Sequence, residues 1–490
     1  MIIAALFFVP LLSGIGALFI KHDLARRALL VAAAAFHMLL VALAMYLKPE
    51  PILDGWFALD GPAYLFLGIT SVLFLAASVY SVGYLGGEGR KGIKDTEEGF
   101  IFTNAPEAVF TACMLAFLSM MTLVIVSQHM GMLWVAIEAT TLVSAPLIYF
   151  HRHRRSLEAM WKYILICSVG IAIALLGNLF LAIAATLPSG HIVPMTVNAL
   201  SAQAAALSAP WLKAAFIFLL VGYGTKMGLA PLHTWLPDAH SESPSVVSAL
   251  LSGALLNCAF LGILRAHQVT LAAGLGGFSG ELLLVLGFFS MFIAAVFILG
   301  QTDYKRMLAY SSVEHMGIMA IGVGLGGGAL FGAMLHAVGH SFTKAMLFFA
   351  AGNILAVYKT KSVTGVKGVM SRLPVTGILW MAGFLAITGL PPFSIFLSKF
   401  VILKAAVDKG MMWEAGIFLA LLAAVFIGMT SGFMKMLQGG TEEIPQKVKE
   451  PLSLVVPACV LCFLVALIGV YQPEAFRRLI EHAAVAFKGI

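Results

Sequence analysis

Long apolar runs recur from one end of the chain to the other, and they constrain its fold more than any other feature. Of the 490 residues, 61% are hydrophobic and 11% are charged, whereas soluble proteins carry about 25% charged residues. Each run is about twenty residues long, the length that a helix needs to cross roughly 30 Å of hydrocarbon. No soluble core could bury all of these runs, so the sequence predicts an all-α polytopic membrane protein.

About fourteen transmembrane helices are predicted. Helices are expected because backbone groups in lipid must be paired within the segment, and the short alternating segments of a barrel are not seen. The first run lacks the basic start and the cleavage pattern of a signal peptide, so it is interpreted as a membrane helix. The predicted spans are 2–20, 28–47, 62–84, 109–127, 129–150, 160–187, 211–230, 245–265, 281–300, 305–325, 328–357, 374–400, 411–435 and 452–471.

The distribution of Lys and Arg predicts the topology. Of 30 such residues, 19 lie in predicted loops on one side and eight on the other. Cytoplasmic loops carry the excess of positive charge. We therefore expect both termini on the outer face of a bacterial or archaeal cell membrane. The net charge of +7 then reflects topology, and no nucleic-acid partner is expected.

Prolines interrupt the seventh and twelfth predicted spans. The seventh runs directly into Pro231 and then Pro237, and the twelfth contains the pair Pro391 and Pro392. Proline removes a backbone donor and clashes with the preceding turn. Unpaired backbone at membrane depth is tolerated only against protein or a water-filled cavity. Two interpretations stay open: simple kinks, or the broken helices of transporters with inverted repeats.

Four charged residues inside predicted spans are the primary candidate proton carriers. Glu138 is midway along the fifth span, and Lys226, Lys344 and Lys399 are the three lysines outside the loops. Each costs about 2.5–3.5 kcal/mol at a helix centre, so such residues usually have a function. A lysine holds its proton better beside a carboxylate, so a Glu–Lys pair whose separation changes can load and release a proton. The alternatives without a role in transport are a structural ion pair for Glu138 and snorkelling of Lys344 and Lys399 toward the membrane surface.

Histidines supply a candidate relay between such sites, because they titrate near neutral pH. His336 and His340 precede Lys344 at intervals of four, so the three residues share one helical face. Glu314 and His315 are adjacent in the tenth span and are secondary candidates. Two more secondary candidates, His233 and Asp238, follow the break of the seventh span. With His240 and Glu242 they form either a cytoplasmic proton entrance or a capped loop.

The cysteines do not indicate a cofactor. The chain has five, and Cys459 and Cys462 form a C-x-x-C pair without a second pair or a histidine partner. Zinc or an iron–sulfur cluster needs about four ligands. We therefore expect neither a metal nor a cofactor in this chain.

Several long motifs identify a family resemblance. Residues 226–244 (KMGLAPLHTWLPDAHSESP), 303–311 (DYKRMLAYS), 389–399 (GLPPFSIFLSK) and the histidine spacing of the eleventh span resemble the antiporter-like subunits of respiratory complex I and the Mrp antiporters. The similarity covers residues 60–440. Within this family, residues 312–317 (SVEHMG) are most similar to component F of hydrogenase-4 and formate-hydrogenlyase-type complexes.

The resemblance implies a fold of two inverted five-helix repeats with broken helices seven and twelve. It divides the chain into helices one to three (1–108), a first repeat (109–265), a second repeat (266–436), and helix fourteen with a short amphipathic segment (437–490).

The resemblance also implies site roles. Glu138 and Lys226 would form the coupled pair, His336 and His340 the central relay, and Lys399 the outer exit. The chain departs from the family at Asn257, where the family has Lys or His, so the relay would use water or the histidines there.

The predicted function is a proton-translocating subunit of a group 4 membrane-bound hydrogenase complex. Its partners would be the other membrane subunits, the redox subunits of the hydrogenase, and the lipid bilayer. Two alternatives stay open: an M-type subunit of NADH-quinone oxidoreductase, or an Mrp-type cation/proton antiporter subunit that carries sodium ions as well as protons. A scaffold that has lost conduction is a third class, for which Asn257 is the best argument.

Overall fold

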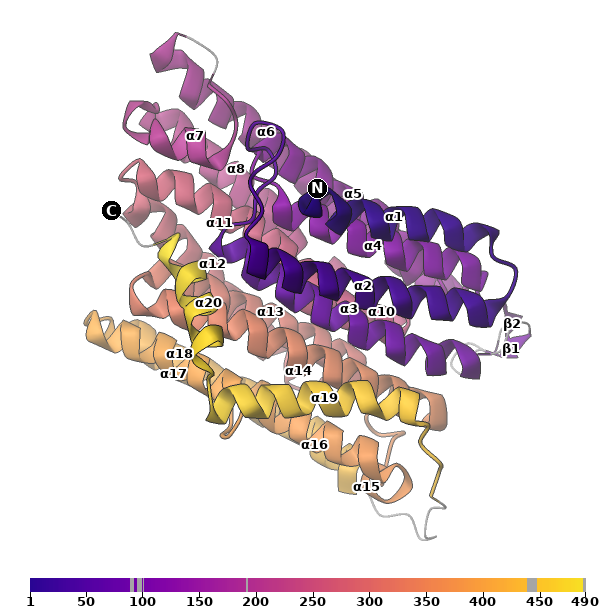
Figure 1. Cartoon of the computed structure of the whole chain (residues 1–490). Coiled ribbons are helices and arrows are strands. Elements are labelled where there is room, and N and C mark those ends of the chain that lie inside the picture. Colours follow the sequence, from indigo (N-terminus) through magenta and orange to yellow (C-terminus); the bar gives the residue numbers. More distant parts are fainter. Residues whose placement is uncertain (89–91, 95–98, 100, 191–192, 439–446, 488–490) are drawn as a thin grey trace.

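Twelve helices among the described residues are long and apolar enough to cross a membrane, and they run side by side in one bundle (Figure 1). The computed structural model describes the chain except for residues 89–91, 95–98, 100, 191–192, 439–446 and 488–490. Three of the loop charges used for the topology, Arg90, Lys91 and Lys488, lie outside the described residues. The prediction of an all-α polytopic membrane protein is confirmed.

In the first half, the described residues form eleven α-helices, a 3-10 turn (η1), a π-helical segment (η2) and a small hairpin. They are α1 (Ile2–Phe19), α2 (Asp23–Leu47), α3 (Gly61–Gly87), β1 (Ile93–Lys94) antiparallel to β2 (Ile101–Phe102), α4 (Glu107–Val126), α5 (Met130–Ile148), α6 (Arg154–Ser189), α7 (Val197–Ala202), the 3-10 turn η1 (Ala204–Ala206), α8 (Ala209–Met227), α9 (Trp235–Glu242), α10 (Ser245–Leu250), η2 (Leu251–Leu255) and α11 (Leu256–Ala272).

Nine helices are formed by the part of the second half that the structure describes. They are α12 (Gly276–Ile298), α13 (Tyr304–Leu325), α14 (Gly328–Tyr358), α15 (Val369–Arg372), α16 (Pro374–Thr388), α17 (Ser394–Asp408), α18 (Met412–Gln438), α19 (Leu452–Val470) and α20 (Glu474–Val485). Figure 1 shows α13 and α14 between the N-terminal helices α1–α3 on one side and α16–α18 on the other. The predicted amphipathic segment is α20, which packs on α3 and α14.

The two predicted spans that are absent from the twelve are the two that prolines interrupt. The seventh is α8, which ends before Gly228 and is followed by the short helix α9. The twelfth is split into α16 and α17 around Gly389. Both glycines adopt the left-handed conformation, with φ of 84° and 83°, which glycine reaches without a steric penalty. The prediction of broken helices seven and twelve is therefore confirmed.

The breaks leave backbone groups that other elements satisfy. At the first break, the Ser290 hydroxyl of α12 accepts from the N–H of Ala230 (2.9 Å), and Trp235 donates its indole N–H to the carbonyl of Thr225 (2.9 Å). At the second break, α19 approaches so closely that a Cβ on Gly469 would overlap the carbonyl of Pro392. Both breaks are therefore packed against protein, as membrane depth requires.

Arg265 corrects one boundary of the prediction. The eighth span was expected to end at residue 265, with Arg265 in an outer loop, but the helix continues to Ala272 and Arg265 is fully buried. Its guanidinium pairs with Asp60, which also caps α3 by accepting from the N–H of Ala63 (3.1 Å). A buried charge is tolerated when it is paired in this way. A count of loop charges cannot reveal such a pair.

Candidate functional site

A first cluster of buried polar groups connects α5, α6 and α8. The ammonium of Lys226 donates to the hydroxyls of Thr141 (2.8 Å) and Tyr163 (2.6 Å). Thr141 in turn donates to a carboxylate oxygen of Glu138 (3.4 Å), and Ser168 donates to the other oxygen (2.7 Å). The predicted pair of Glu138 and Lys226 is thus brought together through a bridging hydroxyl rather than by direct contact.

Close packing of α6 on α8 positions this cluster. A Cβ on Gly222 would lie 2.6 Å from the carbonyl oxygen of Gly170, and a Cβ on Gly170 would lie 2.6 Å from Cβ of Thr225. Small residues at a helix interface let two backbones approach each other in membranes. The two glycines therefore allow Tyr163 on α6 to reach Lys226 on α8.

A second cluster lies between α13, α14 and α17, and three fully buried histidines form its centre. Nδ1 of His315 lies 2.7 Å from Nε2 of His336, and Nδ1 of His336 lies 2.8 Å from the hydroxyl of Ser398. The ring of His340 lies 5.0 Å from that of His315, centroid to centroid. Lys344 donates to the carbonyl of Leu308 and the hydroxyl of Ser311.

This arrangement matches the predicted spacing of the eleventh span. His336, His340 and Lys344 all face α13, one turn apart, and all are fully buried. Lys344 does not snorkel toward the membrane surface, because its side chain is fully buried in the protein.

Glu314 and Lys399 form a buried ion pair beside the histidines. Nζ of Lys399 lies 3.3 Å from Oε1 of Glu314, and it also donates to the carbonyls of Ile387 and Thr388 at the end of α16. Oε2 of Glu314 lies 3.9 Å from Nε2 of His315. The sequence placed Glu314 only among secondary candidates, whereas here it contacts the charge on the broken helix.

Asn257 lies between the two clusters. It donates to the carbonyl of Gly253 (2.9 Å) and to the hydroxyl of Ser341 (2.7 Å), next to His340. Its Oδ1 and both ring nitrogens of His340 are buried without a hydrogen-bond partner among the described residues. Buried polar atoms normally bind protein or ordered water. A path between the clusters would therefore need water at this point.

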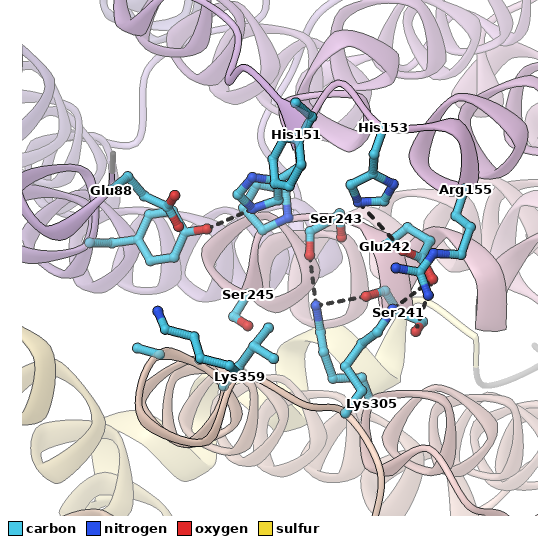
Figure 2. Close-up of a pocket in the computed structure, with 17 residues that line it drawn as sticks. Glu88, His151, His153, Arg155, Ser241, Glu242, Ser243, Ser245, Lys305 and Lys359 are labelled. Atoms are coloured by element: carbon cyan, nitrogen blue, oxygen red, sulfur yellow. Dashed lines mark hydrogen bonds and ion pairs between the residues drawn. The ribbon is translucent and has the colours of Figure 1, made fainter. Parts of the chain in front are cut away.

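A polar cavity of about 190 Å³ opens at the end of the bundle where α6, α9, α13 and α14 meet (Figure 2). Lys305 donates to the carbonyls of Ser241 (3.1 Å) and Ser243 (2.7 Å). Glu242 pairs with Lys361 (2.7 Å) and lies 3.8 Å from His153. This cavity contains charged groups of both signs close to the buried interior.

The four polar residues that follow the first break do not form one site. Asp238 bridges Lys162 (2.9 Å) and Arg306 (2.7 Å) near the surface. His233 packs against Tyr310. Glu242 lines the cavity, and His240 is fully buried against the ring of Phe348. Glu242 and His240 thus lie toward the interior, while Asp238 joins a surface network.

The described residues contain no group of three or more His, Cys, Asp or Glu side chains arranged to hold a metal ion. His315 instead bonds to His336, and His336 bonds to Ser398, while His340 only packs its ring against that of His315. The site is therefore a succession of hydroxyl, carboxylate, ammonium and imidazole groups, which are the groups that can bind and pass protons.

Comparison with known proteins identifies the family. Residues 127–427, which include both clusters and both breaks, match the family described as NADH:quinone oxidoreductase/Mrp antiporter, transmembrane region. The chain belongs to this family of antiporter-like membrane subunits. The first relatives extend the match to most of the chain.

Among the curated antiporter-like relatives, the Hydrogenase-4 component F homolog of Methylacidiphilum infernorum is 35% identical over 91% of this chain and 92% of its own length. The NADH-quinone oxidoreductase subunit N of Desulforudis audaxviator is 28% identical over 84% of this chain and 80% of its own length. The family resemblance predicted from the motifs is confirmed.

Solved structures of antiporter-like subunits share the fold. A chain of the archaeal membrane-bound sulfane sulfur reductase superposes with a TM-score of 0.84 at 20% identity, covering 99% of this chain and 97% of that one. A chain of the Mrp complex from Dietzia gives 0.83 at 19% identity, with coverage of 99% and 97%. A chain of Thermus thermophilus respiratory complex I gives 0.82 at 23% identity, covering 100% and 99%.

Several polar residues of this antiporter-like chain were missed from the sequence. Thr141 and Tyr163 contact Lys226, and His151 and His153 line the polar cavity. Thr141 lies three residues after Glu138, so helical spacing would have placed the two on one face. Tyr163 is brought to its place by the close contact of α6 with α8, and His151 and His153 are placed by the loop that leads into α6.

Proposed function

We propose that this chain is the proton-translocating, antiporter-like subunit of a membrane-bound hydrogenase complex of the hydrogenase-4 type. The observation on which this rests is the series of buried titratable side chains in the two clusters. The relative named Hydrogenase-4 component F homolog supports the type of complex. Hydrogen chemistry would take place in partner subunits, and this chain would move protons.

The coupling element would be the pair of Glu138 and Lys226. Glu138 is only partly buried, and its neighbours on the same flank of α5, Val135 and Leu142, are 45% and 58% exposed. A partner membrane subunit that covers this flank could draw the carboxylate away from Thr141. Lys226 would then lose the interaction that holds its proton, and the proton would move toward the centre.

The central and outer steps would use the second cluster. Water at Asn257 would connect Lys226 with His340, and the proton would then pass through His315 and His336 toward Lys399 and the outer face. Histidines suit this part because imidazole can accept a proton at one nitrogen and donate one from the other. Asn257 cannot titrate, so it would only orient water in this route.

The polar cavity of Figure 2 would be the cytoplasmic entrance. Burial raises the pKa of Glu242, but Lys361 outweighs it and holds that pKa below its ordinary value, so the carboxylate stays charged at neutral pH. Burial lowers the pKa of His151 to about 4, which keeps this imidazole neutral. The charged carboxylate of Glu242 and the neutral imidazole of His151 would bind and orient water at the mouth of the path.

The orientation and the repeats are part of the proposal. The excess of basic loops supports a cytoplasmic location for the end that carries the cavity, with both termini outside. The division into two repeats is supported by the matching breaks at Gly228 and Gly389, with the boundary moved from residue 265 to the end of α11 at Ala272. Labelling of single cysteines placed at residues 2 and 473 with an impermeant maleimide on intact cells tests the orientation, because labelling at neither residue contradicts it.

The decisive experiment uses the assembled complex in inverted membrane vesicles. Glu138→Gln and Lys226→Ala complexes should keep electron transfer in the redox subunits while proton uptake into the vesicles falls to background. Glu281→Gln, a change at an exposed glutamate at the start of α12, is the control. Normal pumping by both site variants in assembled complexes would rule out the proposed function.

Two related functions have support of their own. The relative named NADH-quinone oxidoreductase subunit N and the Mrp complex structure belong to the same family. Purification of the complex through a tag on this chain decides among them. Hydrogenase subunits support the proposal, NADH-binding subunits the first alternative, and transport that requires sodium without redox subunits the second.

A further inference from the structure

The two helix breaks have the same local structure. The N–H of Leu229 donates to the carbonyl of Gly224, and the N–H of Leu390 donates to that of Leu385, both at 2.9 Å. The left-handed residue in each case is the glycine just before the leucine. Both breaks read Gly-Leu-x-Pro, at residues 228–231 and 389–392. One break can therefore be superposed on the other residue by residue.

This superposition relates the two buried lysines. Lys226 lies two residues before Gly228, and the equivalent position before Gly389 is Ile387. Lys399 lies beyond the second break, but its side chain reaches back so that Nζ is 3.4 Å from the carbonyl oxygen of Ile387. Each break thus has one buried lysine beside it, although the two lysines stand at different positions in the sequence.

Glu314 then occupies the role in the second half that Glu138 has in the first. Each is a glutamate near the middle of the helix that follows the first helix of its proposed repeat, α5 and α13. The two pairs differ in state. Thr141 separates Glu138 from its lysine, whereas Glu314 contacts Lys399 directly at 3.3 Å.

The carboxylate of Glu314 faces two groups that can hold a proton. Its Oε1 contacts Lys399, and its Oε2 has no hydrogen-bond partner among the described residues and lies 3.9 Å from Nε2 of His315. That nitrogen also has no partner in this part of the chain, and both side chains are at most 1% exposed. The remaining charged or titratable neighbours are His336, His340 and Lys344 on α14.

We propose that Glu314 is the movable carboxylate of a second ion-pair gate, which controls proton release at Lys399. The proposal rests on the proposed function. The gate adds a step that Lys399 alone does not provide. With the gate, Lys399 loses its proton only when the next proton has arrived.

The gate works in three balanced steps. A proton that arrives through the histidines makes His315 an imidazolium, which attracts Glu314 away from Lys399. Without its counter-ion, the ammonium of Lys399 releases one proton toward the outer face and becomes a neutral amine. Glu314 then takes the proton from Nε2 of His315 and passes it to Lys399. The ion pair forms again, so one proton has entered and one has left.

The test compares four variants in complexes reconstituted into liposomes, with pH dyes on both faces. Glu314→Gln should lower steady-state pumping by about a hundredfold or more, as expected when a positioned proton carrier is lost. Glu314→Asp, which keeps the carboxylate, should restore a substantial part. In a single turnover, Glu314→Gln should still take up a proton on the cytoplasmic face but release it slowly on the outer face.

The third variant separates gating from folding. Glu314→Gln leaves a buried lysine without its partner, which can impair assembly. The double variant Glu314→Gln with Lys399→Met removes both charges and should assemble, yet it should not pump. Pumping by the double variant at the wild-type rate would overturn the proposal, because the pair would then be only structural.

The fourth variant, Glu138→Gln, distinguishes the two proposals. If it stops pumping while Glu314→Gln pumps normally, the gate is wrong and the proposed function stands. If both variants pump normally, the proposed function itself is wrong. Loss of pumping in both, with slow outer release only in Glu314→Gln, supports the gate.

Discussion

Thr141 provides the sharpest test of how Glu138 and Lys226 communicate. Its hydroxyl accepts from the ammonium of Lys226 at 2.8 Å and donates to Glu138 at 3.4 Å. Thr141→Val keeps the shape of the side chain but removes both hydrogen bonds. A hydrogen bond to a charged group contributes about 1.5–3 kcal/mol, and each 1.4 kcal/mol is about tenfold in a rate or equilibrium constant. Proton pumping should therefore fall by roughly ten- to a hundredfold.

The neighbouring residue supplies a matched control. Thr140 is equally buried on the same helix, but its hydroxyl donates to the carbonyl of Ile137 in its own backbone (2.6 Å). Thr140→Val should pump at nearly the wild-type rate. Proton uptake would be measured in inverted vesicles and divided by the electron-transfer rate, after native gels confirm assembly. Equal pumping by the Thr141 and Thr140 variants would refute a bridging role for Thr141.

Further predictions concern stability and pH. Gly222→Ala would force α6 and α8 apart and should destabilise the detergent-solubilised protein by about 1–3 kcal/mol in a thermal-unfolding assay. Gly16→Ala is the control: its Cβ would meet no atom within 4 Å, so the change should be neutral or stabilising. Asp60→Asn leaves the buried guanidinium of Arg265 without its counter-ion and should lower the free energy of unfolding by about 3 kcal/mol. This is the lower end of the range for breaking a buried ion pair, because Asp60 is one-third exposed.

Asp60 also predicts a dependence on pH. Burial would raise its pKa, but Arg265 outweighs burial and lowers it. Because the folded pKa lies below the unfolded value of about 4, the contribution of Asp60 to stability is present above pH 4 and is lost as the pH falls through the folded pKa. Unfolding curves at decreasing pH should show this loss in the wild type and not in Asp60→Asn.

The sequence predicted the fold well because the bilayer imposes strong and local constraints. A run of about twenty apolar residues predicts a helix whatever its neighbours are, and proline interrupts a helix through its own ring. The end of the eighth span was wrong because Arg265 is stabilised by Asp60, which lies 205 residues away in the sequence. A charged residue in a loop and one in a buried ion pair cannot be distinguished in the sequence, because only the packing of the helices reveals the partner.

The candidate site was only partly predictable for a related reason. A spacing of four places His336, His340 and Lys344 on one face of any helix, so their common orientation could be derived from the sequence. Contacts between helices cannot be derived in this way. Tyr163 reaches Lys226 only because two glycines bring α6 close to α8, and His151 reaches the polar cavity through a loop.

The balance of charge in the second cluster leads to a last prediction. Among the described residues there, Glu314 is the only carboxylate beside two buried lysines, Lys344 and Lys399. A single carboxylate cannot fully compensate two ammonium groups in a medium of low polarity. A proton on Lys344 would therefore weaken the hold of Glu314 on Lys399 and favour release at the outer end.

Lys344→Arg separates this electrostatic role from that of a relay. Arginine keeps the positive charge but does not release its proton. If Lys344 passes protons itself, the Arg variant and Lys344→Met should both stop pumping. If Lys344 acts through its charge while the histidines carry the proton, Lys344→Arg should keep outer release and Lys344→Met should slow it. Wild-type pumping by both variants would contradict both roles of Lys344. The central path of the proton would then consist of the histidines alone.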